Sequence, residues 1–180
     1  MAFSNCSRFL IAASVAEEGS LAIIDVQQGI IVENGTAILR ELSVNKIVVN
    51  PSNDGVVDID FVTVGQRGSF AVWQYDHKTQ RIMQIIPDMN SDLQHTDFTS
   101  ATFTPKLSAP YNSEIVMLGT ADGCVVAMNP NPKEGRWEWV EHGKKEQIFA
   151  AGVSQIVYRH AQVVIASSVG LMIRYADKHA

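Results

Sequence analysis

The chain alternates between short apolar runs and short polar turns, and this pattern occurs four times. Each copy has an apolar run, a polar turn that ends in Gly, and a second apolar run. The copies lie at residues 9–25, 60–76, 114–129 and 163–177. The runs are rich in β-branched and aromatic residues and show partial alternation of apolar and polar positions. The pattern therefore predicts four β-hairpins in equivalent positions.

Glycines mark the four predicted turns. They are Gly19, Gly68, Gly123 and Gly170, spaced 47 to 55 residues apart. Glycine is favoured at a hairpin turn because it takes a positive φ without a Cβ clash. A similar spacing between successive copies, at about this length, is typical of a repeat architecture.

Further short apolar runs lie between the hairpins. They precede the second, third and fourth hairpins at residues 46–51, 98–105 and 153–158, and follow the first three at 29–32, 81–86 and 137–140. Residues 36–44 could form a short helix or a fraying outer strand. Each repeat then holds about four strands, which is typical of a β-propeller blade. We expect an all-β chain of about four blades, at residues 9–44, 45–92, 93–147 and 148–180.

Two segments resemble the WD-repeat family. They are Gly119-Thr120-Ala121-Asp122-Gly123 at the third turn and Val72-Trp73-Gln74-Tyr75-Asp76 in the second repeat. In that family a His, a Ser or Thr, an Asp and a Trp form a hydrogen-bonded set within a blade. The resemblance implies this role for His95, Thr120 and Asp122 in the third repeat and for Trp73 in the second.

The repeats depart from the family pattern. Met128 stands where the third repeat would have Trp, and Arg67 stands where the second would have the turn Asp. Residues 119–130, 152–156 and 167–171 are similar to degenerate blades of cilia- and flagella-associated WD-repeat proteins. That resemblance implies a structural or adaptor role in the cytoplasm or cytoskeleton, with microtubule or axonemal partners.

The resemblance also bears on blade number. A closed propeller of this family usually has seven blades, and the last repeat here lacks an obvious fourth strand. A part-propeller exposes sheet edges and open faces. We therefore expect the remaining blades to come from a longer protein or from another chain.

Composition narrows the function classes. The chain is 46% hydrophobic and 18% charged, which favours a folded protein over a disordered one. A net charge of −5 disfavours nucleic acid and anionic membrane surfaces as partners, since both are bound through Lys and Arg. Arg8 followed by the apolar run 9–16 could be a secretory signal, but that run is also in register with the repeat. Cys6 and Cys124 could form one disulfide or remain reduced thiols.

Motifs for catalysis, metal ions or cofactors are not evident. The five histidines are scattered, and no G-x-S-x-G or phosphate-binding motif occurs. Asp58 and Asp60 share one face of a predicted strand, where they could bind a cation, serve acid–base chemistry or form a solvated face. We expect no metal site and no cofactor.

Arg136, Trp137 and Trp139 are the main candidates for binding a partner. The two indoles at i and i+2 share one strand face. Trp and Arg are favoured anchors of protein interfaces, although these residues could instead pack between blades. We expect a non-enzymatic protein-interaction scaffold. The alternative is a propeller enzyme, such as a quinone-dependent dehydrogenase or a hydrolase, with its active site over the central channel.

Overall fold

Within the described part of the chain, every regular element is a β-strand. The computed structural model describes residues 1–14, 20–35, 43–53, 58–87, 89, 91–104, 115–128, 146–160 and 162–176. It contains fifteen strands in this part, and no helix there has the length and apolarity needed to cross a membrane. The prediction of an all-β chain is confirmed.

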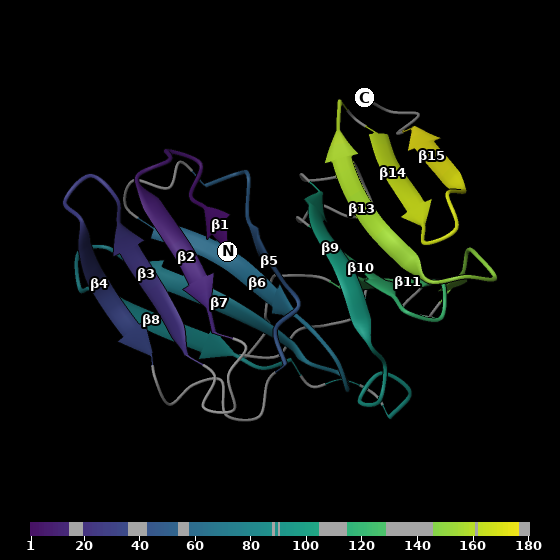
Figure 1. Ribbon diagram of the computed structural model, residues 1–180, viewed down its shortest axis with the longest axis horizontal. Coiled ribbons are helices and arrows are strands. Elements are labelled where there is room, and N and C mark those ends of the chain that lie inside the picture. The colour runs from purple at the N-terminus through teal and green to yellow at the C-terminus, as the bar shows by residue number, and fades with distance from the viewer. Residues whose placement is uncertain are drawn as a thin grey trace.

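The strands form four antiparallel sheets in which neighbours in sequence are also neighbours in space (Figure 1). The first sheet contains β1 (Ala2–Phe3), β2 (Phe9–Ala13), β3 (Leu21–Asp25) and β4 (Ile30–Gly35). The second contains β5 (Lys46–Val49), β6 (Asp58–Val64), β7 (Phe70–Asp76) and β8 (Arg81–Ile85). The third contains β9 (Phe98–Thr104), β10 (Ile115–Thr120), β11 (Cys124–Met128) and β12 (Glu146–Gln147). The fourth contains β13 (Val153–Arg159), β14 (Gln162–Ser167) and β15 (Met172–Ala176).

The four predicted hairpins are the second and third strands of these sheets: β2–β3, β6–β7, β10–β11 and β14–β15. Two differences concern the flanking strands. The two-residue β1, which pairs with β2, was not predicted. The strand expected at residues 137–140 lies outside the described residues, and the short β12 pairs with β11 instead. Residues 36–42, where helix and strand were left open, also lie outside the described part.

The predicted turn glycines have the expected backbone conformation wherever they are described. Gly68, Gly123 and Gly170 have φ values of 71°, 86° and 87°. Gly123 is also closely packed, because a Cβ on it would lie 2.2 Å from the Phe149 carbonyl oxygen and 2.4 Å from that of Ala151. Gly170 has nothing within 4 Å of the same position.

The sheets pack face to face in chain order. Phe9, Ile11 and Ile23 of the first sheet are fully buried against Phe61 and Trp73 of the second. A second cluster joins the second and third sheets, and a third joins the third and fourth. We call the side of a sheet that is turned toward the next sheet in chain order its forward face, and the opposite side its backward face.

The first strands of the sheets lie next to one another. β1 contacts β5, β5 contacts β9, and β9 contacts β13. Sheets that are stacked face to face with their first strands adjacent form a propeller-like arrangement.

Candidate functional site

The residues predicted to anchor a partner cannot be placed. Arg136, Trp137 and Trp139 lie outside the described residues, so their role stays a prediction. A pocket with a described lining lies elsewhere, on the second sheet.

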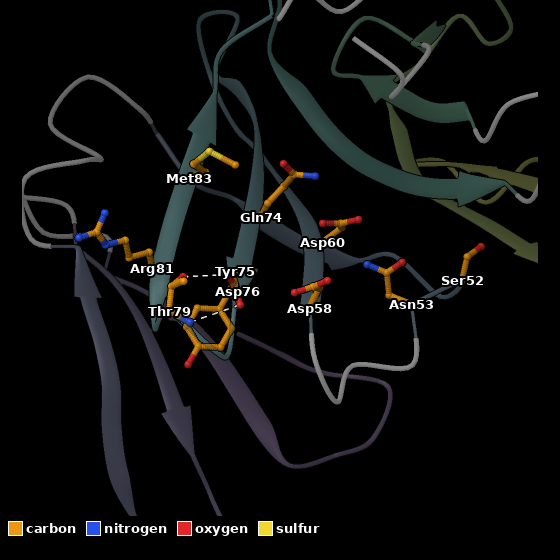
Figure 2. A pocket seen from close by; sticks show the side chains of 10 residues that line it. All are labelled: Ser52, Asn53, Asp58, Asp60, Gln74, Tyr75, Asp76, Thr79, Arg81 and Met83. Atoms are coloured by element: carbon orange, nitrogen blue, oxygen red, sulfur yellow. Dashed lines mark hydrogen bonds between the residues drawn. The ribbon is translucent and has the colours of Figure 1, made fainter.

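A pocket of about 880 Å³ lies on the forward face of the second sheet (Figure 2). Three adjacent strands form the floor of the pocket, and their register aligns the lining side chains in rows across the strands. Asp58 of β6 lies opposite Asp76 of β7, which lies opposite Arg81 of β8. The next row is formed by Asp60, Gln74 and Met83. Ser52 and Asn53, which follow β5, line one side.

The pocket lies at one end of that sheet face. Further along β6 and β7, Val62, Val64, Phe70 and Val72 are buried against the third sheet. Strand alternation then places Asp60 and Gln74 on the same face, beyond the apolar part. The prediction that Asp58 and Asp60 share a strand face is confirmed, and both line this pocket.

The charged residues among the described lining residues are mostly acidic, with three aspartates and one arginine. A hydrogen bond from the Thr79 hydroxyl at 2.8 Å holds the pKa of Asp76 below its ordinary value, and the Lys78 backbone N–H supports the same charge. Asp76 therefore has a structural task in the β7–β8 turn. Asp58 is exposed, so its carboxylate can receive a partner, and Asp60 lies half-buried beside it on the same strand face.

The geometry favours recognition of an extended polar or cationic group. No group of three His, Cys, Asp or Glu side chains in the described residues is placed to hold a metal ion. The floor offers carboxylate oxygens and an amide beside one apolar side chain, Met83, which is 61% exposed. These groups suit the backbone and the basic side chains of a peptide segment.

The hydrogen-bonded set implied by the WD resemblance is present only in part. Thr120 Oγ1 donates to Asp122 and accepts from the Cys124 backbone N–H at 2.8 Å. The role implied for His95 is wrong. His95 lies at the exposed end of the 91–95 turn, and in the described part of the chain no hydrogen bond includes it. Its neighbour Thr96 makes the local bond instead, from its hydroxyl to the Asp92 carbonyl oxygen.

Trp73 does hold its blade together. Its indole N–H donates to Thr63 Oγ1 at 2.8 Å, and its ring stacks on Phe61. Arg67, which replaces the turn Asp, has a positive φ of 54°, and its backbone N–H donates to Asp97 Oδ1. The carboxylate at this turn is thus supplied by the segment that enters the next sheet.

Ser100 links the first strands of three sheets and was missed from the sequence. It is fully buried on β9, and its Oγ accepts from the Ile156 N–H of β13 at 2.9 Å. Lys46 Nζ of β5 lies 3.2 Å from the same oxygen, and burial lowers the pKa of Lys46. No sequence signal separates this serine from other strand serines, because its partners lie more than fifty residues away.

Comparisons of this chain with known proteins give information on its fold. No family model matches the chain, and no curated protein matches it. Similar solved structures include the computationally designed Ika4 protein, with a TM-score of 0.56, 15% identity, and coverage of 92% of this chain and 84% of that one. The designed Ika8 protein has a TM-score of 0.63 at 15% identity, with 97% of this chain and 44% of that one covered. U3-55K has a TM-score of 0.57 at 11% identity, with 97% and 50% covered.

At such low identities the likeness concerns the fold alone. This chain spans about half the length of Ika8 and of U3-55K, and most of the length of Ika4. The four-sheet arrangement therefore occurs both in a chain of similar length and in chains about twice as long.

Proposed function

We propose that this chain is a non-enzymatic protein-interaction scaffold, a segment of a WD-type β-propeller that presents the acidic pocket to a basic segment of a partner protein. The observation that carries the proposal is the part of the second sheet's forward face that forms the pocket and that no described residue covers. Carboxylates from neighbouring strands line it on a floor fixed by β-sheet hydrogen bonds. A rigid, preformed surface of this kind favours binding because little ordering entropy is lost.

The cellular context is part of the proposal. A cytoplasmic setting with microtubule or axonemal partners rests on the sequence resemblance alone. An acidic surface on such a partner would not suit this pocket, since like charges repel. The pocket would need a basic partner segment, and complementary charge contributes to specificity and to the rate of association.

The test is to measure binding of short Lys- and Arg-rich peptides to the chain, using neutral and acidic peptides of equal length for comparison. We expect basic peptides to bind and the Asp58→Asn/Asp60→Asn variant to weaken that binding about 2- to 30-fold, because each exposed ion pair contributes about 0.2–1 kcal/mol. Asp92→Asn is the matched control. It removes one exposed carboxylate outside the pocket and should leave binding nearly unchanged.

Two results would contradict the proposal. One is equal binding of basic and neutral peptides, and the other is equal weakening by the pocket variant and the control. The enzyme alternative makes a different prediction. A small molecule or metal ion, rather than a peptide, would raise the melting temperature, because ligands that bind only the native state stabilise it.

A further inference from the structure

At each end of the sheet stack, one sheet face is covered by no described residue. This face is largely apolar at the first sheet and carries both apolar and polar residues at the fourth. At the first sheet this is the backward face. Leu10, Ala12, Ala22 and Ile24 alternate with the buried residues of β2 and β3 and are half-buried. Phe3 of β1 pairs with Leu10, and Ile31 of β4 pairs with Ile24, so both join this face, 57% and 60% exposed.

At the fourth sheet the uncovered side is the forward face. Val157 of β13 pairs with Val164 of β14, and Ala166 of β14 pairs with Met172 of β15. Their alternate neighbours, including Ile156 and Ile165, are buried against the third sheet. Val157 is 38% exposed and Met172 64% exposed, and the same face also carries Gln155 and Arg159 of β13 and Arg174 of β15.

Register shows that residues on these two faces occupy positions that face a neighbouring sheet elsewhere in the stack. The last paired residues before each hairpin turn are Ala13 with Leu21, Val64 with Phe70, Gly119 with Val125, and Ala166 with Met172. The first three pairs face the next sheet, so Ala166 and Met172 occupy the position that would face a fifth. One residue earlier, Ala71 in the second sheet and Val126 in the third face the preceding sheet. Ala12 and Ala22 occupy that position in the first sheet, where the structure shows no preceding sheet.

We propose that a second copy of this chain covers both faces. The forward face of one copy's fourth sheet would pack on the backward face of the other copy's first sheet. The same contact, with the two copies exchanged, would form a second time and close the ring. Both halves of the interface are present on one chain, and the stack already uses this kind of interface three times in succession. A head-to-tail contact forms a closed ring when its rotation suits closure. That this arrangement also occurs within chains twice as long is consistent with two copies forming one ring.

The test measures the solution mass of the 180-residue chain over a range of concentrations by analytical ultracentrifugation. We expect a closed dimer of twice 19.8 kDa, with no larger species as concentration rises. Ile31→Glu and Met172→Glu each place a carboxylate in one half of the interface. Each should weaken dimerisation by at least about 30-fold, because an interfacial carboxylate without a partner loses its hydration.

The control is Ile86→Glu. Ile86 is 61% exposed, as accessible as Ile31, but it follows β8 and lies on neither end face. It should leave the dimer intact, as should the pocket variant Asp58→Asn/Asp60→Asn. A failure of the dimer proposal can therefore be distinguished from a failure of the peptide-binding proposal. All three glutamate positions are exposed in the single chain, so the variants should keep the wild-type circular dichroism spectrum and melt cooperatively.

Three outcomes would overturn the inference. A monomer at all concentrations would mean that further sheets of a longer chain, or another protein, cover these faces. Assemblies that grow with concentration would mean that the faces meet without closing a ring. If both end-face variants formed a dimer as stable as that of the wild type, the interface would lie elsewhere.

Discussion

The close packing of Gly123 allows a direct test of how the third and fourth sheets are joined. Its φ of 86° nearly equals that of Gly170, which is 87°. The two glycines differ in their surroundings, because an added Cβ at Gly123 would meet two backbone carbonyl oxygens and at Gly170 would meet open space. Replacing each by alanine therefore separates backbone strain from the close approach.

The expected losses follow from these surroundings. A left-handed conformation costs a residue with a Cβ about 1–2 kcal/mol, and the stiffer unfolded chain returns about 0.4–1 kcal/mol. Gly170→Ala should therefore lower the free energy of unfolding by about 1 kcal/mol. Gly123→Ala should lose about 1–3 kcal/mol more, because carbonyls at 2.2 and 2.4 Å must move and overpacking costs this much. The Ile148 and Phe149 backbone N–H groups that donate to the Gly123 oxygen would be disturbed as well.

The assay is equilibrium unfolding in urea, with free energies compared at equal slopes. Gly29→Ala is a second reference, since Gly29 has a φ of 67° and open space around the same position. Equal losses at all three glycines would refute the reasoning. They would show that the segment at residues 147–152 does not approach the β10–β11 turn as closely as the structure indicates.

Three further changes test the hydrogen bonds that hold the sheets together. Thr63→Val should lower the free energy of unfolding by about 1–3 kcal/mol, because it leaves the buried Trp73 N–H without its acceptor; Thr63→Ser is the control, and both are measured by urea unfolding. Ser100→Ala should cost a similar amount and should speed amide hydrogen exchange at Ile156, whose N–H loses its acceptor. The Arg8 guanidinium holds the pKa of Asp25 below its ordinary value, so the stability that this pair contributes is present above the ordinary carboxyl pKa. It is lost as pH falls through the lower folded value, and an unfolding series across acidic pH should show the wild type and Arg8→Met converging there.

Much of the fold could be predicted from local sequence because each hairpin carries its own signals. The apolar runs and the turn glycines lie within about fifteen residues of one another, so no distant contact is needed to recognise them. The two-residue strand β1 has too few residues to show a period. Its pairing with β2 depends on the chain reversing at residues 4–7, where the Ser4 and Phe9 backbones are joined by a hydrogen bond of 2.8 Å.

The candidate site was only partly predictable. Alternation along one strand placed Asp58 and Asp60 together, and the structure confirms it. Gln74 and Arg81 joined them only through the register of β7 and β8, which the sequence does not state to within one residue. A shift of one residue would have moved these side chains to the opposite face. The prediction for His95 was wrong for a related reason: a motif gives the residue but not the direction in which the turn presents it.

The partial alternation of the strands has a physical cause that also bears on the uncovered end faces. A strand buried on one side alternates apolar and polar residues, whereas a strand between two sheets must be apolar on both. The second case explains the continuous runs Phe70–Trp73 and Cys124–Met128, which lie in the middle of the stack. β2 in the first sheet and β14 in the fourth have the same two-sided character, in Phe9–Ala13 and in Val163–Ala166, although described residues cover only one side of each. Strands at a permanently solvated end would be expected to carry polar residues on the outer side. β2 and β14 therefore have sequences suited to burial on both faces, as packing against another sheet of this kind requires, whereas β13 and β15 carry Gln155, Arg159 and Arg174 on the outer side.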